Sequence, residues 1–367
     1  MGGMKALDKA KLGGKYLLNH ALQEIDVRTD GHRSKPNIVY AHVTPTCNLK
    51  CIHCNLPKVD GIEHGTLRRV NEMSTDEWLN SLTQLRDWLG PFKLNIPGGE
   101  PFVRKDIMQI LEHSCDIGIM TGVVTNGTFI TEKVADKLAE MGMFNVNISL
   151  DGFREETHLH FRARYYDKTM KAFDRLDAAR KRHGSDMRIL IKFTLMGYNC
   201  AEALEVIEWA KEKGFDGVMM QPLELKHDEV ELDYLWPSDF TELDRVVDRM
   251  LEMKASGYPL LNDTSHIRKF KTYFRAAKHR QASLLERQGI CHVGVTNFFI
   301  GSNGDVVTCF YMDPVGNLRD ETPKEIWDGA QARKRREEIR TCGRDCLLTC
   351  MTTRTLRDKT ELFLRVL

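Results

Sequence analysis

The sequence predicts an α/β fold: a partial (β/α)6 TIM-like barrel followed by a small C-terminal α+β domain. Between residues 37 and 222, short β-type segments alternate with longer helical segments, which is typical of a parallel sheet with helical crossovers. Six such units are too few to close an eight-stranded barrel, so we expect the sheet to be open on one side. From Cys291 onward the sequence changes to a short hairpin pattern and a group of cysteines, which predicts the second, smaller domain.

We expect four parts along the chain of 367 residues. Residues 1–36 form a basic N-terminal flank, with an amphipathic helix expected from about Lys5 to Gln23. Residues 37–222 form the barrel, and residues 223–290 form a charged, helix-rich bridge. Residues 291–367 form the auxiliary domain.

Each expected strand of the barrel is a short apolar or β-branched run. The strands are 38–43, 94–96, 121–125, 144–150, 188–195 and 217–220. The helices between them are 78–89, 107–115, 131–141, 169–183 and 201–213, and Ser74 is a favoured N-cap for the first. Further along we expect helices at 240–254, 267–288 and 323–339, and a hairpin at 298–307 with Asn303-Gly304 in its turn.

Charge and hydropathy exclude several classes of protein. Lys and Arg total 53 against 52 for Asp and Glu, so the net charge of +1 indicates no nucleic-acid partner. No apolar run approaches the roughly 20 residues of a transmembrane segment, and the N-terminus lacks a secretory apolar core. We therefore expect a cytoplasmic protein.

The ten cysteines are clustered along the chain. A secreted disulfide scaffold is normally short and spreads its cysteines evenly, whereas here three fall within eight residues and five in the last fifth. Clustering in a cytoplasmic chain indicates metal or iron–sulfur ligation. Cys115 and Cys200 stand apart in helical segments, where we expect them to belong to the core.

The first cluster contains Cys47, Cys51 and Cys54 and directly follows the first expected strand, where barrel enzymes carry their chemistry. Three thiolates can hold three irons of a cubane cluster, while full protein ligation takes four, so one iron stays open to a chelating ligand. The alternative is a zinc site completed by His42 or His53, which would make the chain a zinc-stabilised, non-catalytic interaction module. Zinc motifs usually contain paired cysteine couples, so a cluster is favoured.

This triad, with three and then two residues between its cysteines, resembles the signature of the radical SAM superfamily. Gly98-Gly99-Glu100-Pro101, after the second strand, is similar to the family's motif for the methionyl amino group of S-adenosylmethionine. The resemblance implies that the glycines allow close backbone approach and that Glu100 accepts an ammonium hydrogen bond. It also implies that Asn126 lines the cofactor pocket; without the family, each motif would be interpreted only as a turn.

Other cofactor contacts follow from the same resemblance. Ser149 and Asp151, at the end of the fourth strand, are expected near the ribose and carboxylate of the cofactor. Arg162 or Arg164 is expected to pair with the cofactor carboxylate. His53 is expected to offer its backbone to the adenine, not its imidazole to a metal.

The C-terminal cysteines resemble the SPASM and twitch extensions of the superfamily, which hold auxiliary 4Fe–4S clusters. Cys291 and Cys309 bracket the expected hairpin, and Cys342, Cys346 and Cys350 recur at four-residue intervals. Two fully ligated clusters would need about eight ligands, so we expect one, held by Cys291, Cys309 and two of the last three, with two auxiliary clusters as the alternative. On a helix that spacing would put those three on one face. The fifth cysteine is either a ligand variant, a buried thiol or a hydrogen donor to a substrate radical.

The resemblance implies a reductive cleavage of S-adenosylmethionine at the 4Fe–4S cluster, with an electron from a donor such as flavodoxin or ferredoxin. The resulting radical would abstract hydrogen from a small molecule, such as a sugar, cyclitol or isoprenoid-like intermediate, leading to dehydrogenation, epimerisation or a related outcome. The alternative is a maturase that modifies a ribosomally made peptide. Two features favour the small molecule: only 46 residues precede the first cysteine, and Phe310 stands where sulfatase-maturing relatives commonly carry an acidic base.

Overall fold

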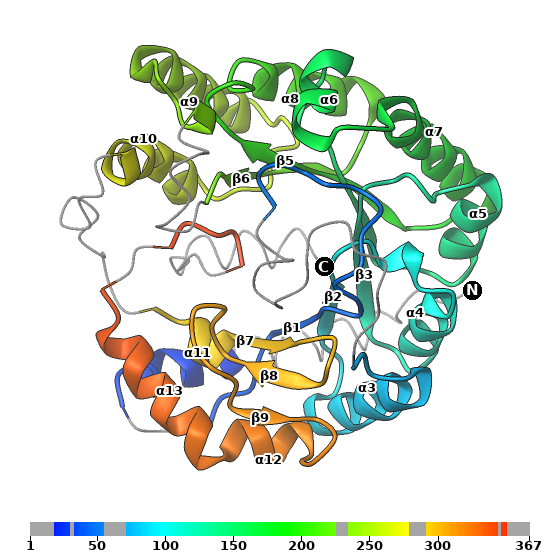
Figure 1. Cartoon of the computed structure of the whole chain (residues 1–367), viewed down its shortest axis with the longest axis vertical. Helices are drawn as coiled ribbons and strands as arrows, with labels where there is room; N and C mark the ends of the chain where they lie inside the picture. Colours follow the sequence, from blue (N-terminus) through cyan, green and yellow to red (C-terminus); the bar gives the residue numbers. More distant parts are fainter. Residues whose placement is uncertain are drawn as a thin grey trace.

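The computed structural model describes residues 18–29, 33–54, 71–224, 234–278, 291–343 and 346–350. Within these ranges, nine strands form one curved sheet in the order β6-β5-β4-β3-β2-β1-β7-β8-β9 (Figure 1). The sheet ends at β6 on one side and at β9 on the other, so it is not a closed barrel. The predicted fold class is therefore confirmed.

The first six strands follow one another in space as they do along the chain, and every neighbouring pair is parallel. They are β1 (Ile38–Ala41), β2 (Lys93–Ile96), β3 (Met120–Thr125), β4 (Asn145–Ser149), β5 (Arg188–Leu195) and β6 (Gly217–Pro222). Their carboxyl ends lie at the same rim of the barrel. The loops that carry the predicted cofactor motifs therefore meet at that rim.

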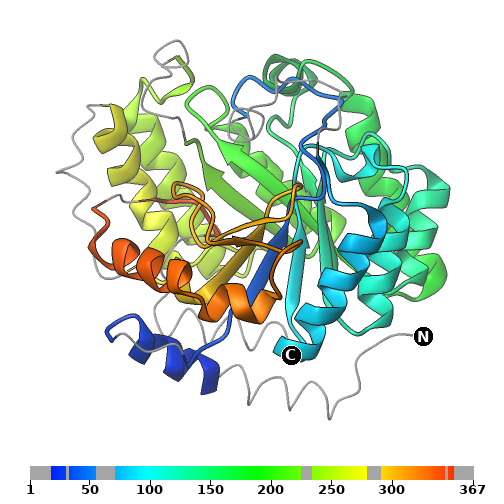
Figure 2. The same ribbon diagram turned by 60° about the horizontal axis from the view of Figure 1, so that its bottom comes forward.

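Helices connect successive strands and cover the outside of the sheet (Figures 1 and 2). They are α3 (Thr75–Leu89), α4 (Ile107–Asp116), α5 (Glu132–Glu140), α6 (Glu155–Arg162), α7 (Tyr166–His183) and α8 (Glu202–Lys213), with a 3-10 turn, η1 (Pro101–Val103). Ser74 and Glu77 form the capping box that begins α3. The sequence analysis missed α6, whose N-cap, Arg154, makes no capping hydrogen bond through its side chain.

Alternation of side chains along the strands separates the two faces of the sheet. In β5, Ile189, Ile191 and Phe193 are fully buried in the main core beneath the helices. Lys192 and Thr194 alternate with them along the strand and therefore point to the inner face. The inner face of β5 thus carries Lys192 and Thr194 beside Leu190, while its outer face supplies the apolar core.

The C-terminal part continues the same sheet. β7 (Asn297–Ile300) pairs in parallel with β1, and β8 (Asp305–Val307) and β9 (Gly316–Asn317) follow as antiparallel strands. The predicted hairpin is confirmed, with Gly304 at a φ of 91° in its turn. The boundaries proposed for the domains remain a prediction.

The remaining helices lie around this unit. They are α9 (Phe240–Ala255), α10 (Thr264–Lys278), α11 (Val293–Thr296), α12 (Pro323–Asp328) and α13 (Ala330–Thr341). The single helix predicted at 323–339 is wrong, because Gly329 adopts an extended conformation and separates α12 from α13. The predicted bridge helix extends to residue 288, but its part from residue 279 onward lies outside the described residues. The predicted N-terminal helix is described only from residue 18, and residues 18–26 are helical. No helix in the described part is long and apolar enough to cross a membrane.

Candidate radical and cluster site

The loop that carries the first cysteines lies against the glycine-rich loop after β2. Gly99 N donates to Thr44 O at 2.9 Å, and Glu100 N donates to Thr46 O at 2.8 Å. A Cβ atom on Gly99 would stand 2.2 Å from Thr46 O, and Gly98 has a φ of 148° that other residues rarely adopt. Both glycines are therefore required for this backbone contact, which fixes the start of the cysteine loop.

Glu100 is fully buried at the rim of the barrel. One carboxylate oxygen accepts hydrogen bonds from Thr125 Oγ1 at 2.8 Å and Phe102 N at 3.2 Å, and the other accepts from Asn126 N at 2.7 Å. Burial raises the pKa of Glu100 to about 7, and these hydrogen bonds partly oppose that rise. A cationic ligand group would stabilise the ionised carboxylate here.

Asn126 connects the third strand to the cysteine loop. Its Nδ2 donates to Asn48 Oδ1 at 2.9 Å, and its Oδ1 accepts from Thr128 N at 3.0 Å. Asn48 Nδ2 in turn donates to Thr128 Oγ1 at 2.9 Å. The Asn126 side chain thus fastens the segment between the first two cysteines, and Asn48 is a contact that the sequence analysis missed.

Asp151, Arg162 and His53 form a buried charged group. Asp151 Oδ2 lies 2.6 Å from both Nε and Nη2 of Arg162 and 3.1 Å from His53 Nε2, and its Oδ1 accepts from Thr194 N at 2.8 Å. Burial alone would raise the pKa of Asp151, but the charges of Arg162 and His53 hold it well below its usual range. Arg164 is exposed. Of the two candidate arginines, Arg162 is therefore the one beside the cysteine loop.

The three thiols lie in a polar, partly enclosed loop. Cys51 is buried, and Cys47 and Cys54 are half-buried. Burial raises the pKa of Cys47 to about 11 and that of Cys51 to about 12, while the positive charge of Arg162 acts in the opposite direction on both. Such thiols need a positive partner to ionise, which a bound iron centre supplies together with the guanidinium.

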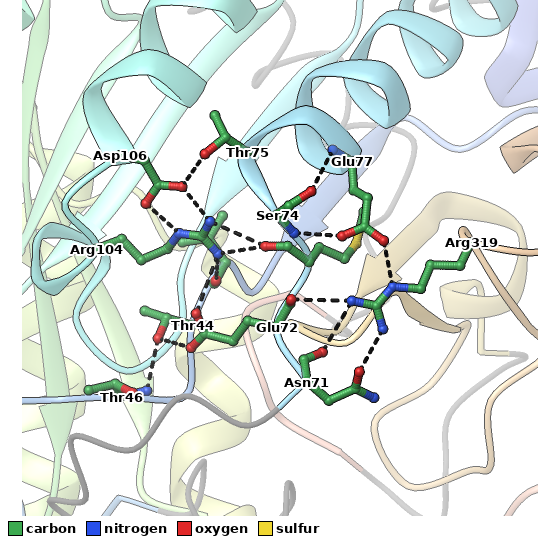
Figure 3. Close-up of polar contacts among 12 residues, drawn as sticks. Thr44, Thr46, Asn71, Glu72, Ser74, Thr75, Glu77, Arg104, Asp106 and Arg319 are labelled. Atoms are coloured by element: carbon green, nitrogen blue, oxygen red, sulfur yellow. Dashed lines mark hydrogen bonds and ion pairs between the residues drawn. The ribbon is translucent and has the colours of Figure 1, made fainter.

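Arg104, on the segment that leads from the glycine-rich loop into α4, anchors the chain around this site (Figure 3). Its guanidinium, 3% exposed, donates to Val43 O at 2.7 Å and to Asp106 Oδ2 at 2.6 Å. It also lies 3.5 Å from Glu72, whose other oxygen accepts from Thr44 Oγ1 at 2.5 Å. Arg104 therefore holds the end of β1 against the segment that returns from the cysteine loop.

Arg319 reaches the same segment from the C-terminal unit (Figure 3). Its Nε donates to Glu77 Oε1 at 2.6 Å, and its Nη atoms donate to Asn71 Oδ1 at 3.0 Å and Glu72 O at 3.2 Å. A hydrogen bond from Arg319 is the main reason that the pKa of Glu77 falls to about 2. The sequence analysis identified neither arginine, because the contacts that matter here join distant segments: Arg104 with Val43, and Arg319 with Glu77.

Four C-terminal cysteines share one apolar cluster on the face of β1 and β7 opposite the main core. Cys309 packs with Phe299 in this cluster, and Cys291, Cys346 and Cys350 lie against it together with Tyr40 and Phe310. Cys342 is the C-cap of α13 and is not part of the cluster. The last three cysteines do not share a helix face, because residues 346–350 are not helical.

The main chain of the 346–350 segment is held by side chains from three elements. Gln221 of β6 accepts from Thr349 N at 2.8 Å, and His266 Nε2 of α10 lies 3.0 Å from Leu347 O. Asn297 of β7 donates to Cys350 O. These contacts fix the last two cysteines between β6 and β7.

Comparison with known proteins bears directly on this arrangement. Residues 42–199 match the model of the radical SAM superfamily, and residues 291–351 match that of the SPASM iron–sulfur cluster-binding domain. The chain belongs to the radical SAM superfamily. It is an enzyme. Its cofactors are S-adenosylmethionine, the 4Fe–4S cluster that binds S-adenosylmethionine, and auxiliary iron–sulfur ligation in the SPASM domain.

Two relatives, both from Methanosarcina barkeri, align along most of this radical SAM enzyme. An AdoMet-dependent heme synthase is 28% identical over 84% of this chain and 88% of its own, and an Fe-coproporphyrin III synthase is 25% identical over 89% and 81%. The structure of Streptococcus suis SuiB bound to its precursor peptide SuiA has a TM-score of 0.63 at 17% identity, covering 89% of this chain and 71% of that one. At that identity the likeness concerns the fold alone.

The residues of the radical SAM site fit their cofactors. Cys47, Cys51 and Cys54 offer three thiols on one loop, and Arg162 supplies a positive charge beside them. The alternative of a non-catalytic zinc module is wrong, because the matching family consists of enzymes.

Proposed function

We propose that this radical SAM enzyme is an oxidoreductase for a small molecule, with one auxiliary 4Fe–4S cluster held by Cys291, Cys309, Cys346 and Cys350. The observation that carries the proposal is the shared apolar cluster of these four thiols, which leaves out Cys342. When bound, S-adenosylmethionine and its cluster supply a carbon radical able to take hydrogen from an unactivated carbon. The auxiliary site then offers a place for an electron from the substrate.

In this proposal the residues of the rim bind and orient the cofactor. Glu100 accepts a hydrogen bond from the methionyl ammonium, with its buried carboxylate already aligned by three donors. Arg162, oriented by Asp151, pairs with the methionyl carboxylate. Ser149 contacts the ribose and the backbone of His53 contacts the adenine. Cys47 and its two partners in the loop hold the cluster.

Iron porphyrins are the first substrates to test. The two relatives that align along most of the chain carry the names of a heme synthase and an Fe-coproporphyrin III synthase. The position after Cys309, where sulfatase-maturing relatives commonly carry an acidic base, is occupied here by Phe310. Its ring packs on that of Phe299, with ring centroids 4.1 Å apart, and cannot accept a proton. We further propose a cytoplasmic enzyme with a flavodoxin- or ferredoxin-type electron donor.

A peptide substrate is the second candidate. A PqqA peptide cyclase from Bradyrhizobium diazoefficiens is 32% identical over 33% of this chain and 30% of its own. The fold also resembles that of SuiB with its bound peptide. Because the aligned stretch covers only a third of this chain, we rank this candidate below the small molecule.

The test is to incubate the reconstituted, reduced enzyme with S-adenosylmethionine and Fe-coproporphyrin III deuterated on its side chains. We expect deuterium in the 5′-deoxyadenosine and an altered porphyrin mass. Cys51→Ala should abolish both, whereas Cys115→Ala, which changes a cysteine packed against the core, should retain both. Undeuterated deoxyadenosine with unchanged porphyrin would contradict the small-molecule proposal for this compound, and the same assay with a precursor peptide would then test the second candidate.

A further inference from the structure

Lys192 is a charged side chain on the inner face of the barrel that the proposed chemistry does not use. Its neighbours along β5, Ile191 and Phe193, point into the fully buried core on the other side of the sheet. In the adjacent strands its partners are Ser149 of β4 and Met219 of β6. Lys192 therefore lies one strand away from the residue that we place at the cofactor ribose.

The ammonium group of Lys192 has no acidic partner in the described part of the chain, where it makes neither a hydrogen bond nor an ion pair. Burial lowers its pKa, and the thiol of Cys350 is the one described group whose charge opposes that change. The buried cation Arg162, by contrast, is neutralised by Asp151. Lys192 is half-buried, and its one charged neighbour among the described residues, Cys350, belongs to the proposed auxiliary cluster. A carboxylate on a ligand would therefore give its ammonium group a partner of its own.

The two neighbouring strands place uncharged side chains beside Lys192, Ser149 on β4 and Met219 on β6. Ser149 and Gln221 lie on the same inner face, and Gln221 holds the segment that ends at Cys350. A single positive charge among neutral hydrogen-bonding groups suits a monoanion better than a phosphate, which binds more commonly to several cations or to helix N-termini. Lys192 is thus placed between the cofactor end of the barrel and the auxiliary cysteines.

We propose that Lys192 binds a carboxylate group of the substrate on the inner face of the barrel. The inference rests on the proposed small-molecule function and deepens it, because it assigns a carboxylic acid as the substrate class. The ion pair would fix one end of the substrate beside Cys350 and leave the rest facing the cofactor end. Lys192 acts as a specificity residue and takes no part in the radical step.

The experiment measures binding of Fe-coproporphyrin III, a tetracarboxylic acid, and of its tetramethyl ester to the reconstituted holoenzyme. The variants are Lys192→Met, which removes the charge at similar volume, and Lys192→Arg, which keeps it. Lys93→Met is the matched control, because Lys93 also lies on the inner face, in β2, and its ammonium group is 5.6 Å from the ring centroid of Phe144. Bound iron and thermal unfolding are recorded for every variant.

We expect Lys192→Met to bind the acid at least tenfold more weakly than the wild type while both bind the ester equally. Lys192→Arg and Lys93→Met should bind the acid within about threefold of the wild type, and all variants should carry the same iron. Binding needs no cleavage of S-adenosylmethionine, so failure of the radical chemistry would not obscure this result.

Three results would overturn the inference. One is equal binding of the acid by Lys192→Met and the wild type. Another is a wild type that does not distinguish acid from ester, whether it binds both or neither. The third is a loss of iron in Lys192→Met, because Lys192 would then serve the auxiliary site near Cys350.

Discussion

Replacing Gly99 by Ala should separate the glycine-rich loop from the cysteine loop. The new Cβ would lie 2.2 Å from Thr46 O and 2.6 Å from Pro45 O, both inside the 3.0 Å that Cβ atoms keep, the first by 0.8 Å. Both contacts are with backbone, so neither can be relieved by a side-chain rotation. Such overpacking costs about 1–3 kcal/mol, and a misplacement of about 1 Å at a reacting site can lower the rate roughly 100-fold.

The assay for Gly99→Ala is the initial rate of 5′-deoxyadenosine release at saturating and at limiting S-adenosylmethionine. We expect kcat/KM to fall by about 100-fold with a loss of about 1–3 kcal/mol in the free energy of unfolding. Gly184→Ala is the control, because Gly184 has a φ of 56° and open space around it, so the change costs about 1–2 kcal/mol of backbone strain far from the site. If both variants lose stability and neither loses kcat/KM, the close approach of the two loops does not position the cofactor.

The other predictions concern the charged groups and the C-terminal cysteines. Arg319→Ala should raise the KM for S-adenosylmethionine several-fold with kcat nearly unchanged, because it removes the hydrogen bonds that hold the segment after the cysteine loop. An unaltered KM would show that the Arg319 contacts in Figure 3 have no positioning role. Asp151→Asn should lower the free energy of unfolding by about 3–5 kcal/mol, because it leaves a buried guanidinium unpaired. Asp136→Asn, at an ion pair on the surface, should lower it far less, because solvent screens that pair. Similar losses in denaturant titrations would refute this reasoning. Cys350→Ser should lower bound iron from about eight to about four per chain and Cys342→Ser should not, and equal iron in the two variants would exclude the ligand set proposed from the apolar cluster.

Much of the fold could be predicted from local patterns. The segment 188–195 has the apolar alternation of a strand and forms β5 with the same bounds, and Ser74 and Glu77 begin α3 as a capping box. Local patterns failed where the signal was weak. α6 begins without a capping side chain, and Gly329 interrupts what looked like one helix.

The candidate site likewise contains residues that local sequence could identify and contacts that it could not. The cysteine triad and Gly98-Gly99 could be identified because their residues are adjacent in sequence and follow strands. The contacts that hold them could not, because they join distant segments: Arg319 with residues 71–77, and Asn126 with Asn48. The choice among the C-terminal cysteines likewise depended on which of them reach the cluster around Phe299.

The most direct test of this account is the fate of S-adenosylmethionine in the reduced, iron-loaded enzyme. With dithionite as electron source, the wild type should release 5′-deoxyadenosine, and Cys54→Ala, which removes one thiol of the loop at the barrel rim, should release none while retaining its auxiliary iron. A wild type that carries iron and releases only intact S-adenosylmethionine, or a Cys54→Ala variant as active as the wild type, would contradict it.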